Sequence, residues 1–324
     1  MHNSHSAPRN LVLVRRARTT ILALASVGLL GWSIATPNAF AADGAFEQTL
    51  SGVPEDATVH IITTEGDVNV RPSFTDSVLV EAKISIDPEK WNSNVLSPDA
   101  AIERLEHDPP IQQTGSTIRI GSIDDPDLTQ NISISYTVKI PSSAKLKVRI
   151  GTGSLDVHQL ENDVDASTAS GHVTVTDIHG SVRASSKSGA VDVRSITGTA
   201  TVAIGSGPTN GEDLAAPKVK SSSGPVTFHN VHGSCDVAVN SGDIKVDGAP
   251  SEGWELHTNS GNVSIAVSDP ADFQLNAQTE TGDIHNSLPL SQFNGGSSGL
   301  LAGSVGNGGP MIDLSTDSGD ISIE

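Results

Sequence analysis

From about residue 149 to the end of the sequence, short stretches of alternating apolar and polar residues follow one another. In Val173-Thr-Val175 and Val191-Asp-Val193 the apolar residues stand two positions apart, so they share one face of a β-strand. A small polar residue and a glycine precede each stretch, as in Ser170-Gly171. A strand this short cannot bury its apolar face alone. The pattern therefore predicts many short strands that stack on one another.

The glycines before these strands recur at successive spacings of 18, 18, 18, 17, 18, 19, 21 and 37 residues, the last close to two periods. We assign them a structural role as turn residues: Gly153, Gly171, Gly189, Gly207, Gly224, Gly242, Gly261, Gly282 and Gly319. A second turn lies between successive glycines, as in Ile178-His-Gly-Ser-Val182. Each unit thus holds two strands and two turns. The sequence predicts an all-β fold, a single-stranded β-helix or β-solenoid of about 18-residue coils. An antiparallel sandwich is the alternative.

Residues 44–148 do not continue the regular 18-residue repeat. They are expected to form a β-rich N-terminal cap or the first coils. They hold one predicted short helix, with Ser97 as N-cap, Pro98 at its first position, and Ile102 and Leu105 on its apolar face. Strands are expected at 78–84, 117–120 and 132–140. We place the solenoid repeats at 149–324, with a Gly/Ser-rich surface loop at 288–310.

The first 41 residues carry the pattern of a secretory signal peptide. Arginines precede an apolar run at about 21–35, and Ala39-Phe40-Ala41 offers small residues at both key positions of a cleavage site. Cleavage there would give a chain that begins at Ala42. The expected location is the periplasm, the cell surface or the medium. An uncleaved anchor at 21–35 is the alternative.

Composition narrows the possible functions. The 324 residues carry 38 Asp and Glu against 19 Lys and Arg, a formal net charge of −19, and no basic cluster stands out along the chain after the leader. Nucleic acid is therefore not an expected partner. The single cysteine, Cys235, forms neither an internal disulfide nor a thiolate metal cage.

Two groups of residues suggest metal binding and are better explained as turns. Asp67, Asp243, Asp283 and Asp320 follow turn glycines, but His172, Ala190, Pro208, Pro225 and Asn262 take the same position elsewhere, so no continuous carboxylate ladder is expected. His179 and His232 share one phase of the second turn, with His229 nearby, yet three coils separate them, about 14 Å. We predict no metal site and no cofactor.

No catalytic motif is present. The sequence has no Gly-x-Ser-x-Gly elbow, no His-Glu-x-x-His helix and no phosphate-binding loop. The Ser-Gly pairs recur in coil after coil, whereas a catalytic serine is expected once. Trp91 and Trp254 are isolated, so stacking on sugars is limited to one or two points.

The tandem Ser-Gly-Asp-Ile-x-Val units, the segment Tyr136-Thr-Val-Lys-Ile-Pro141 and the C-terminal Met311-Ile-Asp-Leu-Ser-Thr-Asp-Ser-Gly-Asp-Ile-Ser-Ile323 resemble the bacterial putative-adhesin family of unknown function, DUF4097, a β-helical envelope family. The resemblance implies an extracytoplasmic bacterial protein and transfers no catalytic residue. The sequence thus favours an exported, non-enzymatic, adhesin-like structural or binding module, with a glycan or an envelope protein as its surface ligand. A membrane-anchored periplasmic sensor or accessory domain is the first alternative, and a polysaccharide-active solenoid enzyme is the second.

Overall fold

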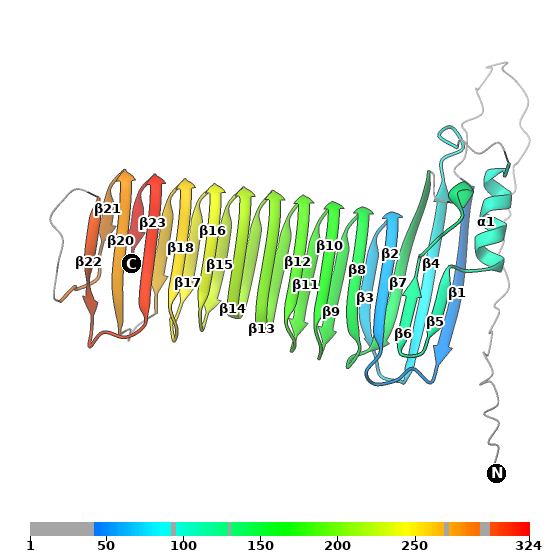
Figure 1. The fold of residues 1–324 in the computed structure, drawn as a ribbon, viewed down its shortest axis with the longest axis horizontal. Coiled ribbons are helices and arrows are strands. Elements are labelled where there is room, and N and C mark those ends of the chain that lie inside the picture. Colours follow the sequence, from blue (N-terminus) through cyan, green and yellow to red (C-terminus); the bar gives the residue numbers. More distant parts are fainter. Residues whose placement is uncertain (1–41, 92–94, 129–130, 269–271, 292–298) are drawn as a thin grey trace, which may run out of the picture.

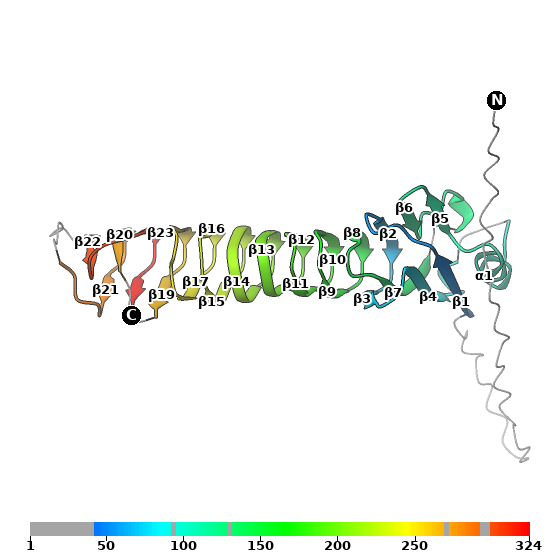
Figure 2. The same cartoon turned by 90° about the horizontal axis from the view of Figure 1, so that it is seen from below.

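The computed structural model describes residues 42–91, 95–128, 131–268, 272–291 and 299–324. The predicted leader at 1–41 lies outside these ranges. The described chain forms a long, flat rod of two facing sheets with a small helix at its N-terminal end (Figure 1; Figure 2 shows the two layers). Strands of successive coils pair in parallel, such as β10 with β12. The predicted β-solenoid is confirmed, and parallel pairing between coils contradicts the antiparallel sandwich.

Each coil gives one strand to each sheet. In spatial order the first sheet holds β5 (Ile111–Thr114), β6 (Thr117–Ile120), β2 (Thr58–Glu65), β8 (Lys145–Thr152), β10 (Val164–Ser170), β12 (Val182–Ser188), the later halves of β13 (Val191–Ser206) and β14 (Thr209–Ser223), β16 (Cys235–Ser241), β18 (Trp254–Ser260), β23 (Met311–Ser318), β20 (Phe273–Thr281) and β22 (Leu300–Val305).

The second sheet lies behind the first. It holds β1 (Ala42–Ser51), β4 (Ser77–Ile86), β7 (Ile132–Pro141), β3 (Val68–Ser73), β9 (Leu155–Leu160), β11 (Val173–Ile178), the early halves of β13 and β14, β15 (Val226–Val231), β17 (Ile244–Gly248), β19 (Val263–Val267), β24 (Ile321–Ile323) and β21 (Ile284–Asn286).

The core is the thin layer of side chains between the two sheets. Val173 and Val175 are buried while Thr174 between them faces outward, as the alternation predicts. Stacking in register repeats this placement along the rod, for instance Leu155, Val173 and Val191. Most of the apolar core is therefore a ladder of β-branched and leucine side chains.

The turn glycines form a ladder of their own. All nine predicted glycines have φ between +118° and +153°. A Cβ added at Gly171 would lie 2.1 Å from the carbonyl oxygen of Gly153, so the corners stack too closely for any side chain. Their amide groups continue the ladder, because Gly153 N–H donates to Ser170 and Gly171 N–H donates to Ser188 in the next coil.

Coil order at the C-terminal end departs from chain order. β18 pairs with β23, and β23 in turn pairs with β20, so the last coil of the chain (β23–β24) lies between β18–β19 and β20–β21. The glycine ladder accordingly runs Gly261, Gly319, Gly282. The 37-residue spacing is thus not two periods in sequence: the chain passes over one coil position and later returns to fill it.

The N-terminal end is interleaved in the same way. The coil β2–β3 lies between β6–β7 and β8–β9, although β8 directly follows β7 in the chain. On the far side of β7, β4 and then β1 extend the second sheet with antiparallel pairing. Residues 58–73 therefore form a true coil within the region expected to be a cap or first coils.

A single α-helix, α1 (Pro98–His107), packs against β1 at this end among the described residues. The Ser97 side chain accepts a hydrogen bond from Ala100 N–H, and Ile102 and Leu105 are buried, so the predicted cap and apolar face are confirmed. A short 3-10 turn, η1 (Pro126–Leu128), leads toward β7. No helix in the described part of the chain is long and apolar enough to cross a membrane.

The Gly/Ser-rich run at 288–310 is only partly a loop. Leu300–Val305 form β22, which pairs antiparallel with β20 at the end of the first sheet. The sequence did not indicate this strand, because its Leu-Leu-Ala-Gly-Ser-Val segment lacks the repeat pattern.

Two buried threonines of the core give a first prediction. Thr258 Oγ1 donates to the Gly242 carbonyl at 3.0 Å, whereas Thr209 Oγ1 is buried without a partner and its neighbours in the ladder are Val191 and Val226. Thr209→Val should raise the free energy of unfolding by about 1 kcal/mol, and Thr258→Val should lower it by about 1 kcal/mol. Urea unfolding of both variants measures the difference. Equal destabilisation by both changes would contradict this account of Thr209.

Candidate binding groove

In five successive coils, one residue adopts a left-handed conformation near the end of the second-sheet strand. These residues are Gln159, Asp177, Ser195, Asp213 and Asn230, with φ between +52° and +58°. In β11 the alternation slips at this point, so that Thr176 and Asp177 both face away from the core before Ile178 is buried. The slip bends the strand as a β-bulge does and aims one extra polar side chain outward. Asp and Asn tolerate this backbone region better than most residues.

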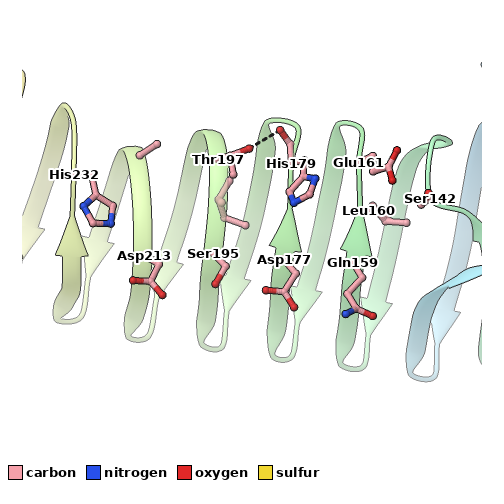
Figure 3. Close-up of a pocket in the computed structure, with 12 residues that line it drawn as sticks. Ser142, Gln159, Leu160, Glu161, Asp177, His179, Ser195, Thr197, Asp213 and His232 are labelled. Atoms are coloured by element: carbon pink, nitrogen blue, oxygen red, sulfur yellow. Dashed lines mark hydrogen bonds between the residues drawn. The ribbon is translucent and has the colours of Figure 1, made fainter.

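Stacked on one another, these bends produce a groove along one edge of the rod. The groove has a volume of about 630 Å³ and is lined by Ser142, Gln159, Leu160, Glu161, Asp177, His179, Ser195, Ile196, Thr197, Asp213, Ala215 and His232. Figure 3 shows two rows of side chains along it. Gln159, Asp177, Ser195 and Asp213 form one row, and Glu161, His179, Thr197 and His232 lie in the other.

Backbone contacts between coils hold the rows in place. His179 N–H donates to the Leu160 carbonyl at 2.9 Å, and Thr197 Oγ1 donates to the His179 carbonyl at 2.7 Å (Figure 3). Leu160 and Ile196 are almost fully buried and close the floor. The groove is thus a fixed feature of the coil geometry.

Nine of the twelve lining residues have polar side chains, and no lysine or arginine is among them. Glu161, Asp177 and Asp213 supply carboxylates, and Ser142, Ser195 and Thr197 supply hydroxyls. Asp213 also accepts a hydrogen bond from Asn230 of the next coil. A groove of this kind attracts groups that donate hydrogen bonds and repels anions.

Two of the three histidines that suggested metal binding in the sequence line the groove. His179 and His232 line the groove with Thr197 and Ala215 in the coils between them, while His229 is not among the lining residues and instead contacts Asp247 at 2.5 Å. Within the described ranges, no group of three or more His, Cys, Asp or Glu residues is arranged to hold a metal ion.

The aspartates after the turn glycines accept hydrogen bonds from backbone N–H groups at the corners. Asp67 accepts from Ser154 N–H at 2.8 Å, Asp243 from Asn262 N–H at 2.8 Å, and Asp320 from Asp283 N–H at 2.9 Å. Each carboxylate thus ties its own coil to a neighbouring one. The Asp283 backbone takes part as the donor at the end of this series.

Other ionisable groups form contacts outside the lining of the groove, on β3, β9 and β13 and in the turn before β11. Burial acts to raise the pKa of Asp156, but the hydrogen bond from Arg71, 2.8 Å away, and the neighbouring His158 outweigh it and lower the pKa. His172 contacts Asp192 at 2.5 Å, and Asn210 donates to the same carboxylate at 2.7 Å. The contacts of Arg71 with Asp156 and of Asn210 with Asp192 link strands of adjacent coils.

The two tryptophans of the described ranges and the cysteine are buried or half-buried. Trp254 is 1% exposed and donates from Nε1 to the Gly233 carbonyl, so it fills the core and is unavailable for stacking on a sugar. Trp91 is half-buried and donates to the Leu96 carbonyl. Burial raises the pKa of the Cys235 thiol, which keeps it protonated and unreactive.

The groove was not predicted from the sequence, although a signal for it was present. In the second-sheet strands of five successive coils (β9, β11, β13, β14 and β15), an extra polar residue before a buried apolar residue breaks the period-two alternation, as in Thr176-Asp177-Ile178. Because this break recurs about every 18 residues, it marked a bulge in each of these five coils.

Comparison with known proteins gives the family. Solved structures that resemble the chain include a "putative adhesin" of Bacteroides fragilis NCTC 9343 (14% identity, 86% of this chain and 97% of that chain, TM-score 0.40). They also include a "putative cell adhesion protein" of Clostridium sporogenes ATCC 15579 (10% identity, 86% and 98%, TM-score 0.25) and a "putative adhesin" of Parabacteroides merdae ATCC 43184 (9% identity, 87% and 96%, TM-score 0.28). No curated protein matches the sequence. The model of the Toastrack DUF4097 family matches residues 113–324, and the chain therefore belongs to this family.

Proposed function

We propose that the protein is a non-enzymatic, adhesin-like binding module of the bacterial envelope, and that the groove holds an extended, hydroxyl-rich chain such as a neutral glycan. The observation that carries this proposal is the groove itself, about 630 Å³ in volume and walled by two rows of polar side chains.

The side chains that line the groove determine the chemical class of ligand that it can bind. Carboxylates such as Asp177 and Asp213 accept hydrogen bonds from sugar hydroxyls, and these charge-assisted bonds are stronger than neutral ones. Successive coils lie about 4.8 Å apart, so the same kind of contact recurs along the rod. A chain of repeating units would make many such contacts at once and gain affinity from their number.

A binding role explains the groove better than catalysis does. Its polar positions recur in coil after coil, and the His–carboxylate contacts of the described residues (His158, His172 and His229) lie outside it. Asp177 and Asp213 are two coils apart, about 9.6 Å, at the upper limit for an inverting glycosidase. Hydrolysis of a bound glycan is therefore a measurable outcome that would contradict the proposal.

Export is part of the proposal and rests on the leader pattern of residues 1–41. A solenoid with an exposed polar groove suits a position at the periplasm, the cell surface or in the medium. Retention of residues 21–35 as an anchor would instead favour the sensor or accessory role.

Two substitutions test the groove. Asp177→Asn keeps a residue that tolerates the left-handed conformation but removes the charge, and should weaken glycan binding about tenfold. Ala215→Arg places a bulky cation in the groove and should abolish binding. A glycan array followed by calorimetry on the selected glycan measures both effects.

The matched control is Ala266→Arg, since Ala266 is also a half-buried alanine of a coil but lies on β19 outside the groove. It should bind as the unmodified protein does. Glycan binding that survives Ala215→Arg, or release of reducing ends from the bound glycan, would refute the proposed function.

A further inference from the structure

Basic side chains gather on one part of the outer face of the first sheet, although the chain as a whole carries a net charge of −19. All of them are exposed, and they come from β6, β8, β12 and β14: Arg119, Lys145, Lys147, Arg149, Arg183, Lys187, Lys218 and Lys220. We call this set the basic face. The Lys and Arg side chains that form ion pairs in the described part of the chain are Arg71, Lys90, Arg104 and Arg194, none of which belongs to it.

Strand register arranges these cations in a row along the rod. One row of paired positions reads Arg119, His60, Lys147, Asp165, Arg183, Thr201, Lys218. A cation therefore stands at every second strand, which corresponds to a repeat of about 9.6 Å. In the adjacent row, Arg149 and Lys220 flank Ser167, Ser185 and Ala203.

The charges of the basic face act together at its N-terminal part. Burial and then the positive charges of Lys147, Arg119 and Arg149 lower the pKa of His60, which lies between Arg119 and Lys147 in the row. These cations disfavour protonation of His60, because it would add a further positive charge beside them. A bound anion would relieve the repulsion.

The other half of the same outer face is acidic. Continuing along the rod, Lys218 is followed by Asp236, Glu255 and Asp313 in the same row. Asp317 also lies on β23, and Glu280 lies on the next strand, β20. A flat anionic membrane laid against the whole face would be repelled by this half. Ile62, 40% exposed, is the exposed large apolar side chain of the described strands in the basic half, so little apolar surface is available for insertion into lipid.

We propose that the basic face binds a linear polysaccharide that carries carboxylate or sulfate groups, lying along the rod axis between β6 and β14. The charges at alternate strands meet acidic groups of the polymer, and Ser167, Ser185 and Thr201 offer hydroxyls to its sugars. This site uses residues separate from the acidic groove, and the two sites select ligands of different charge.

Two probes test the proposal with the whole protein: heparin, which carries sulfates and carboxylates, and polygalacturonate, which carries carboxylates alone. Both should bind at low salt and dissociate as salt rises. The double change Lys147→Gln, Lys218→Gln should weaken binding about tenfold. Lys83→Gln, Lys245→Gln is the matched control, because it removes two exposed lysines from the second sheet and changes the net charge equally. It should change the affinity less than twofold.

Circular dichroism and thermal unfolding of both double variants establish that they are folded. Equal losses in the two variants, or no loss in the first, would overturn the proposal. So would tighter, lysine-dependent binding to phosphatidylglycerol vesicles or to single-stranded oligothymidylate than to heparin. The groove variant Ala215→Arg should bind heparin normally, so failure of the groove proposal is distinguishable from failure of this one.

Discussion

Gly189→Ala is expected to lower the free energy of unfolding by about 3 kcal/mol or more, a large share of the stability of an ordinary domain. Gly189 has φ +135°, a conformation that alanine rarely adopts, and a Cβ added there would lie 2.1 Å from the Gly171 carbonyl oxygen. The backbone must move to relieve this contact, and movement would break the hydrogen bond from Gly189 N–H to Ser206. Urea unfolding followed by far-UV circular dichroism measures the loss.

The matched control separates the close contact from backbone strain. Gly52 also has positive φ, +69°, but nothing lies within 4 Å of an added Cβ. Gly52→Ala should therefore cost only the strain of a left-handed alanine, about 1–2 kcal/mol. If the two variants unfold at the same urea concentration, close stacking of the corners is not what makes glycine necessary at position 189.

The repeat unit was predictable because each of its parts is local. Alternation over a few residues marks each strand, and a glycine marks each corner, so Thr168 to Val175 alone indicates two strands and a tight turn. The same holds for α1, where Ser97 and Pro98 define the first turn. These signals depend on neighbours in the chain and not on the partner coil.

Which coil stacks on which was not predictable for the opposite reason. Every coil presents the same apolar ladder and the same glycine corner, so β18 finds an equally suitable surface on β20 or β23. β22, whose sequence lacks the repeat pattern, pairs with the outer side of β20 and ends the first sheet there. In the sequence, the irregular spacing of the last turn glycines was the sign of this coil order.

The two surfaces that we propose as binding sites were missed because they join residues a full coil or more apart. Lys147, Arg183 and Lys218 are distant in sequence, yet register places them in one row. Acidic residues such as Asp156, Glu161 and Asp177 lie between them in the chain, so their common row was not visible, although Lys139, Lys145, Lys147 and Arg149 stand close together in the sequence. A repeat of known length allows such rows to be read by aligning coils, provided that the register is known.

Removal of residues 311–324 is expected to unfold more of the C-terminal end than the deleted segment. The deletion takes away β23 and β24 with the fully buried Ile312, Leu314, Ile321 and Ile323, each worth about 1.5–3 kcal/mol of burial. Because β20 and β21 contact the rod through this coil, they lose their parallel partners as well. Hydrogen exchange should show unprotected amides in β20, β21 and β22, while β8–β17 remain protected.

Cross-linking in the full chain tests the interleaved order that underlies this expectation. Ser260 and Ser318 are partners in adjacent strands, and so are Ser318 and Thr281, whereas Ser260 and Thr281 are two strands apart, about 9.6 Å. Ser260→Cys with Ser318→Cys should therefore form a disulfide on oxidation, and Ser260→Cys with Thr281→Cys should not, since a disulfide spans at most about 7 Å between Cα atoms. Cys235 is buried and will not compete. A disulfide that forms readily between positions 260 and 281 would mean that the coils stack in chain order. Retained protection of 273–286 after the deletion would mean that β23 and β24 are not required for a stable C-terminal end.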